Sequence, residues 1–160
     1  HMLVLESMKQ LFDKGKVFQM VMTGKKTTYR DKKYLIKMEK FILENGLQRY
    51  VKLTSFISRE DQLVLMKNAL SVIQPSLFEG WSTVIEDCKS LNQFVLASDL
   101  EVNIDQINNN CLFFERHSSA VLTEKMEMVL EGKTQVVPYD YNQNIEEFKK
   151  NLITVFELEQ

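Results

Sequence analysis

One stretch decides how this chain folds: residues 69–87, with the sequence ALSVIQPSLFEGWSTVIED. The apolar run at its start predicts a buried strand, which must end at Pro75 because proline has no N–H to give to a sheet. Residues 83–86 have the spacing of a capping box led by Thr83, so a helix is predicted to begin there. The stretch therefore predicts a strand-to-helix loop that carries one carboxylate, Glu79.

The predicted helix start gives this loop its chemistry. Free N–H groups and the positive end of the helix dipole would point back towards Glu79 and Gly80, and such an end can hold phosphate. Glycine at position 80 permits backbone geometry, or a close approach, that a side chain would forbid. Two interpretations of Glu79 stay open: a carboxylate that accepts hydrogen bonds from two sugar hydroxyls, and a solvated loop acid.

The rest of the chain alternates between helical and strand patterns. Helices are predicted at residues 3–14, 31–45, 60–68, 83–90, 102–107, 119–130 and 145–158, and strands at 17–23, 50–53, 70–74, 94–97 and 111–114. Strands separated by helices are typical of a parallel sheet covered on both faces. The predicted fold class is α/β: a Rossmann-like, doubly wound parallel sheet with helices on both faces.

Length and composition favour one domain. The chain has 160 residues, of which 44% are hydrophobic, enough for one compact core. His1 and Met2 resemble a cloning remnant, and residues 3–160 are expected to form a single domain. Residues 132–144 are predicted to be an extended connection that carries the final helix away from the sheet's immediate cover.

Charge and cysteine content exclude several classes of protein. Twenty basic and 22 acidic residues give a net charge of -2, so no field attracts nucleic acid. Cys88 and Cys111 have neither disulfide-scaffold nor zinc-ligand spacing, which favours a reducing cytoplasm. No apolar run has the roughly 20 residues that a membrane span needs.

Ligands of open α/β sheets lie at the carboxyl ends of the strands, so three further loops matter: residues 23–26, 54–58 and 98–101. In the last of these, Asp99 and Glu101 would serve the site or cap the next turn. Gly24 and Lys25 follow the first strand and place positive charge there; a solvated basic helix start is the alternative. Phe56 and Ile57 follow the second strand. Either a nucleotide base lies against them, or their side chains simply pack into the core. Glu86 is read first as the capping-box acid.

A resemblance sharpens these interpretations. Residues 73–87, followed by residues 95–99, resemble the donor-site signature of the retaining GT-B glycosyltransferases of the group 1 family. Residues 22–25 and 51–61 resemble that family's first-strand glycine loop and the loop ahead of its next helix. The resemblance covers residues 3–158, which correspond to the carboxy-terminal half of a GT-B fold.

The resemblance implies transfer of a sugar, with retention, from a nucleoside diphosphate sugar and without a bound metal or other cofactor. Glu79 would contact the transferred sugar and Glu86 the ribose hydroxyls. The other expected donor-binding residues are Gly80, Trp81, Ser82, Thr83, Gly24, Lys25, Phe56 and Ile57. The acceptor, a sugar, lipid or protein, would be bound by an amino-terminal domain that is missing here.

Two departures from the family pattern bear on these roles. The family has seven residues between its two glutamates, whereas six separate Glu79 from Glu86, and Ser82 stands where glycine is common. The fragment is expected to fold without catalysing transfer, and the full-length enzyme to be cytoplasmic or peripheral to the inner membrane. The competing interpretations are a non-catalytic nucleotide-binding or interaction module and, more distantly, a GT-B epimerase or phosphorylase.

Overall fold

A computed structural model describes residues 1–24, 29–138 and 140–156. The chain forms, in order, α1 (Met2–Asp13), β1 (Met20–Met22), α2 (Tyr29–Glu44), β2 (Val51–Leu53), α3 (Arg59–Asn68), β3 (Val72–Gln74), α4 (Thr83–Leu91), β4 (Val95–Ser98), α5 (Glu101–Gln106), β5 (Cys111–Phe114), α6 (Ser119–Leu130) and α7 (Tyr141–Val155). This is the predicted order of helices and strands. The first strand is shorter than predicted, and α7 begins four residues earlier; its predicted end at residue 158 lies outside the described residues.

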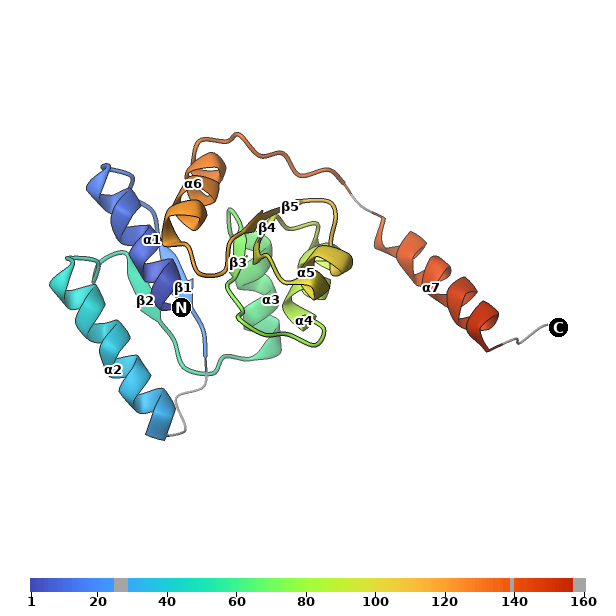
Figure 1. Cartoon of the computed structure of the whole chain (residues 1–160), viewed down its shortest axis with the longest axis horizontal. Helices are drawn as coiled ribbons and strands as arrows, with labels where there is room; N and C mark the ends of the chain where they lie inside the picture. The colour runs from blue at the N-terminus through green and yellow to red at the C-terminus, as the bar shows by residue number, and fades with distance from the viewer. Residues whose placement is uncertain (25–28, 139, 157–160) are drawn as a thin grey trace.

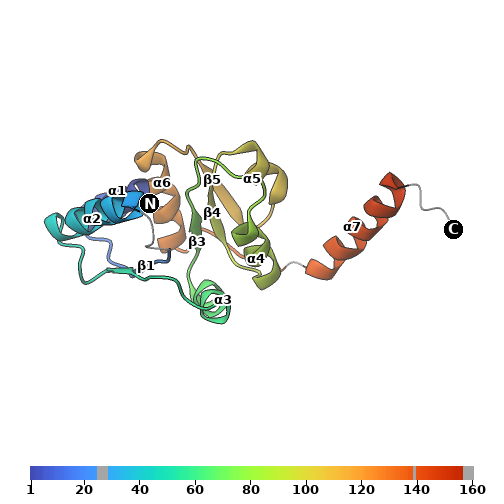
Figure 2. The ribbon, with the colours of Figure 1, turned by 90° about the horizontal axis from the view of Figure 1, so that it is seen from below.

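All the strand pairs are parallel, as the alternation of helices and strands predicted. Met20 of β1 lies opposite Val51 of β2, and Leu96 of β4 lies between Ile73 of β3 and Leu112 of β5. Within the described residues, β1 and β3 share no ladder, so the strands form one two-stranded and one three-stranded sheet. The chain nevertheless has the Rossmann-like arrangement, with helices on both sides of the strands (Figures 1 and 2).

Successive side chains of β4 point to opposite faces, and this alternation divides the core in two. Leu96 packs with α1, α2 and α6, where the buried apolar residues of α1 are Val4, Leu5, Met8 and Leu11. Val95 and Ala97 pack on the other face with Met66 of α3 and with Ile85 and Cys88 of α4. Helix α4 is therefore fixed against the sheet directly behind the loop that carries Glu79.

The connection from α6 to α7 runs over the surface, and α7 stands away from the rest of the chain (Figures 1 and 2). The Asn110 side chain holds this connection through Val137: the Val137 N–H donates to Oδ1 at 2.7 Å, and Nδ2 donates to the Val137 carbonyl at 2.9 Å. At the start of α7, the Tyr141 hydroxyl donates to Oε2 of Glu86 at 3.1 Å. These contacts tie the beginning of α7 to the body.

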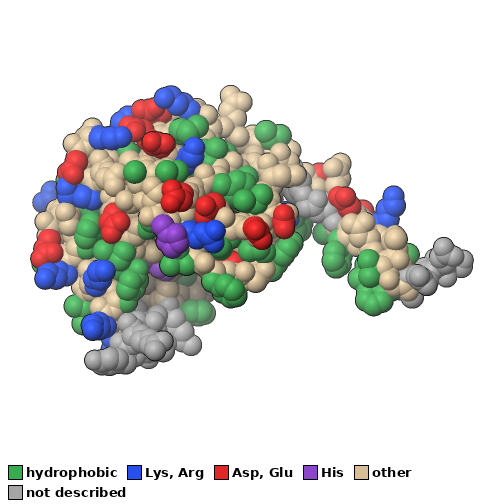
Figure 3. Space-filling view, in the orientation of Figure 1, with side chains coloured by type: hydrophobic (Ala, Val, Ile, Leu, Met, Phe, Trp, Pro, Cys, Tyr) green, Lys and Arg blue, Asp and Glu red, His purple; other side chains and the backbone are tan. Residues whose placement is uncertain are grey.

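The surface is mixed in charge. Acidic and basic side chains are interspersed over the face shown in Figure 3, in keeping with the small net charge. No helix in the described ranges is long and apolar enough to cross a membrane.

Candidate functional site

Glu79 is held in place. Its Oε1 accepts a hydrogen bond of 2.7 Å from the Gln74 side-chain amide and one of 3.0 Å from the Ser76 hydroxyl. Gln74 is the last residue of β3, and Pro75 ends the strand, as predicted. The predicted loop acid is therefore half-buried and fixed by two neighbours that the sequence had not singled out.

The helix cap lies one residue earlier than predicted. Ser82 is the N-cap of α4, and its hydroxyl accepts from the Ile85 N–H at 3.3 Å. The predicted capping box of Thr83 and Glu86 is wrong, because Thr83 is already the first helical residue and the Glu86 side chain bonds elsewhere. Ser82 competes successfully for the cap since it is an equally good N-cap residue, and here it is buried against α5.

Glu86 is turned towards α5 and α7. Its Oε1 accepts from the Gln106 amide at 2.9 Å and from the Lys89 amine at 3.1 Å, and its Oε2 accepts from Tyr141. Burial raises the pKa of the Glu86 carboxyl, but the hydrogen bonds from Gln106, Lys89 and Tyr141, with the Lys89 charge, outweigh it and lower the pKa overall. Glu86 is an ionised acid with partners inside the protein.

Some backbone N–H groups between Glu79 and Glu86 donate hydrogen bonds within the protein, and others have no acceptor among the described residues. Gln106 accepts from the Ser82 N–H at 3.0 Å and donates to the Ser82 carbonyl at 2.7 Å, so the Ser82 backbone is used internally. The N–H groups of Thr83 and Val84, in the first turn of α4, have no acceptor among the described residues. These two donors at the helix end remain for an anion.

The two predicted site glycines have room around them. A Cβ added at Gly80 or Gly24 would meet no atom within 4 Å, and neither residue has a positive φ. The backbone therefore does not itself demand glycine at position 80. Of the two reasons predicted for Gly80, only the close approach of a ligand is left, and it stays a prediction.

One carboxylate that sequence reasoning missed is Asp87. It is only 8% exposed, and the Arg59 guanidinium contacts both of its oxygens from the start of α3. The contact with Asp87, chiefly a hydrogen bond, raises the pKa of Arg59. Residues 80–86 put seven residues between Glu79 and Asp87, which is the spacing of the family's two acids. That spacing was the signal that could have identified Asp87.

A cleft of about 1020 Å³ lies between β1 and β3, where the two sheets are not joined. At the carboxyl ends of the strands it is lined by Thr23, Ile57 and residues 74–78. The structure thus brings Ile57, from the loop after β2, to the same cleft as the loop that leads to Glu79. A pocket of this size suits a ligand larger than a single sugar.

The aromatic site candidates are open to solvent. Phe56 is 79% exposed, which excludes the alternative of plain core packing for its ring, and Trp81 is 59% exposed. Lys25, the predicted cation of the first loop, lies outside the described residues. Asp99, in the loop after β4, holds a turn by accepting from the Arg116 N–H at 3.1 Å.

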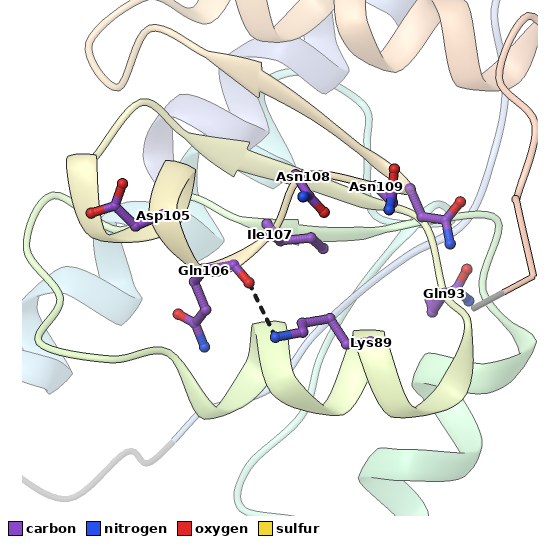
Figure 4. Close-up of a pocket in the computed structure, with 8 residues that line it drawn as sticks. Lys89, Gln93, Asp105, Gln106, Ile107, Asn108 and Asn109 are labelled. Carbon is purple, nitrogen blue, oxygen red and sulfur yellow. Dashed lines mark hydrogen bonds between the residues drawn. The ribbon is translucent and has the colours of Figure 1, made fainter. Parts of the chain in front are cut away.

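A second, smaller hollow of about 220 Å³ lies between α4 and the segment from α5 to β5 (Figure 4). Lys89 crosses it and donates to the Gln106 carbonyl at 3.1 Å. Gln93, also in its wall, donates to the carbonyls of Met66 and Ala69. Because these buried polar groups are already satisfied, the hollow offers a ligand few partners. The described residues form no group of three or more His, Cys, Asp or Glu side chains suited to a metal ion.

The fold is α/β with a candidate ligand site at a strand-to-helix loop, and comparison with known proteins gives the family. Residues 1–152 match the family described as glycosyl transferases group 1, and the chain belongs to this family. No curated protein matches the sequence.

Solved structures share the fold. The chain is similar to a glycosyltransferase from Rickettsia africae (18% identity, TM-score 0.71, covering 82% of this chain and 34% of the other). It is also similar to Alr3699/HepE from Anabaena in complex with UDP (16%, 0.73, 85% and 36%) and to a sucrose-phosphate synthase from Thermosynechococcus elongatus (18%, 0.68, 80% and 33%). The chain spans about a third of the length of these proteins. The likenesses confirm the predicted fold, the Rossmann-like half of a GT-B glycosyltransferase.

Proposed function

We propose that this chain is the donor-binding domain of a glycosyltransferase that moves a sugar, with retention and without a metal, from a nucleoside diphosphate sugar. The observation that carries the proposal is Glu79, held by Gln74 and Ser76 at the carboxyl end of β3, immediately before the free N–H groups of α4. A carboxylate and a helix N-terminus side by side suit a sugar hydroxyl and a phosphate. A complex of the similar Anabaena protein contains UDP, which supports a nucleotide ligand.

In this proposal, Glu79 contacts the transferred sugar. The Thr83 backbone N–H, with those of Gly80 and Trp81, faces the sugar and diphosphate, while Ser82 supports the loop through its internal hydrogen bonds. Charge that develops on the leaving diphosphate is stabilised by the end of α4 and by cations, of which Lys25 after β1 is the candidate in this chain. The base lies against Phe56 and Ile57, and Gly24 lets the chain approach the donor.

Two adjacent acids of α4 are candidates for the ribose hydroxyls. Glu86 is the residue predicted from the sequence, and it already accepts three hydrogen bonds within the protein. Asp87 is favoured by its pairing with Arg59, which lies on the same side as the Phe56–Ile57 loop, and by its spacing from Glu79. Each Asp87 oxygen can accept a further hydrogen bond while Arg59 remains in place.

The acceptor, a sugar, lipid or protein, is proposed to bind to an amino-terminal domain, so that this chain alone binds donor without catalysing transfer. The full-length enzyme is proposed to act in the cytoplasm or at the inner membrane. The experiment is a transfer and hydrolysis assay of the full-length protein with UDP- and GDP-sugars. Glu79→Ala should abolish transfer while it spares nucleotide binding. Full activity of that variant would overturn the assignment of Glu79.

A further inference from the structure

We propose that Gln74 is a positioning residue, which orients the Glu79 carboxylate for the donor sugar; this rests on the proposed function. The Gln74 amide nitrogen lies 2.7 Å from Oε1 of Glu79, 3.1 Å from the Ser76 hydroxyl and 3.2 Å from the Ser82 hydroxyl. The Gln74 side chain therefore connects Glu79, the Ser76 hydroxyl that also hydrogen-bonds to Glu79, and Ser82, the N-cap of α4. The donor-site signature seen in the sequence assigned no role to Gln74.

The two oxygens of the Glu79 carboxylate differ in their hydrogen bonds. Oε1 accepts from both Gln74 and Ser76, whereas Oε2 has no hydrogen-bond partner among the described residues. An ionised carboxylate that is fixed through one oxygen presents the other at a defined place. Oε2 is therefore the oxygen that accepts from a donor hydroxyl.

Gln74 can position Glu79 because it stands on a rigid element. It is the last residue of β3, in register with Ala97 of the buried strand β4. The neighbouring strand end supports the loop too: the Ser98 hydroxyl donates to the Ser76 carbonyl at 2.7 Å, and Asn103 donates to the Ser98 carbonyl at 3.0 Å. Residues on strands are held more precisely than residues on loops. Through its hydrogen bond from Gln74, the Glu79 carboxylate is therefore positioned by the sheet.

The first experiment needs no ligand. In side-chain amide NMR spectra of this chain, the Gln74 Nε2 proton signals should differ from those of the exposed Gln135, because the Glu79 carboxylate accepts a hydrogen bond from this nitrogen. Glu79→Ala should move them towards the Gln135 values, and Glu115→Ala, which removes an exposed acid elsewhere, should not. Gln74 protons that already match Gln135 in the unsubstituted chain would overturn the proposal.

The second experiment separates positioning from general support of the loop. Titrations of UDP and UDP-glucose compare Gln74→Leu with Gln10→Leu, which removes a partly buried glutamine amide between α1 and α6. Gln74→Leu should weaken UDP-glucose binding about ten-fold and UDP binding less than about two-fold, since hydrogen bonds to a charged group are strong. Gln10→Leu should change neither. Equal weakening of both ligands by Gln74→Leu would show a merely structural role.

Two further outcomes remain distinguishable. If Gln74→Leu does not fold, Ser76→Ala removes the other hydrogen bond to Oε1 of Glu79. This variant should reduce the ratio of the affinity for UDP-glucose to the affinity for UDP. An unchanged ratio would overturn the proposal. If neither ligand binds the unsubstituted chain, the proposed function fails in this respect, and the ligand-free spectra decide the Gln74–Glu79 relationship by themselves.

Discussion

Arg59, the first residue of α3, contacts both carboxylate oxygens of Asp87 in α4 through its two terminal nitrogens. The pair joins two pieces of the proposed donor site that are far apart in the sequence: the loop after β2, which carries Phe56, and the helix behind Glu79. Two-point contact between guanidinium and carboxylate fixes orientation as well as distance. A nucleotide that bridges these pieces would meet Asp87 before Glu86, whose oxygens face α5 and α7.

The ribose role can therefore be decided between the adjacent acids. We expect Asp87→Asn to weaken UDP binding by about ten-fold, because a hydrogen bond from the ribose to a carboxylate is stronger than one to a neutral amide. Glu86→Gln should weaken UDP binding by less than about three-fold, because the Glu86 oxygens face α5 and α7. Calorimetry of this chain with UDP measures both. The reverse order would assign the ribose to Glu86, and thermal unfolding of each variant controls for loss of the Arg59 pair.

Loss of the N-cap should destabilise the chain and loosen the site together. Ser82→Ala removes the acceptor for the Ile85 N–H and one partner of Gln74, so the free energy of unfolding should fall by about 1 kcal/mol. Ser118→Ala removes the N-cap of α6, far from the loop, and is the matched control. Denaturant unfolding should show similar losses for both. Only Ser82→Ala should shift the Gln74 side-chain amide signals; a shift in both, or in neither, would contradict the contact network.

Acid should reveal the partners of Glu86. Its pKa is lowered below the ordinary value of 4.5 in the folded chain, so the associated stability is present above that value and is lost as the pH falls through the folded pKa. The melting-temperature difference between the unsubstituted chain and Glu86→Gln should be constant above about pH 5.5 and shrink below about pH 4.5. A difference that grows on acidification would show the opposite sign of shift. Glu131, whose pKa is lowered to about 2 by Lys133 and Lys16, is unaltered in both proteins and cancels.

The cysteines should be unreactive in the folded chain. Burial, with the nearby Asp87 charge, raises the pKa of the Cys88 thiol to about 12, and burial also raises that of Cys111. Since the thiolate is the reactive form, iodoacetamide at pH 8 should leave Cys88 intact and modify half-buried Cys111 slowly. Mass spectrometry with and without urea measures this, because both residues should react once unfolded. Rapid modification of Cys88 in native buffer would contradict its burial between α4 and the sheet.

The order of helices and strands was predictable from the sequence because it depends on local patterns. The apolar run and the proline that follows it mark the end of β3 without reference to any other part of the chain. The missing ladder between β1 and β3 was not predictable, since pairing between strands that are not consecutive leaves no trace in periodicity. The position of the α4 cap was predicted one residue late because Ser82 and Thr83 are both good N-cap residues.

The loop that carries Glu79 was found from sequence, but its supports were not. Gln106 reaches Ser82 across 24 positions and Arg59 reaches Asp87 across 28, and such contacts depend on how helices pack rather than on neighbouring residues. Gln74 was hidden for a different reason. As the polar end of an apolar strand it looked like a boundary, whereas its amide lies at the centre of the loop's hydrogen bonds.

The most direct test of the donor-binding role is titration of this chain with UDP and GDP, followed by amide NMR. The donor-binding role predicts saturable binding of at least one nucleotide, with the largest chemical-shift changes at Phe56 and Ile57, at the first turn of α4 and at Asp87. The hollow beside Asn108 should stay unchanged. A folded sample that binds neither nucleotide, or shifts confined to residues away from the Glu79 loop, would contradict the donor-binding role.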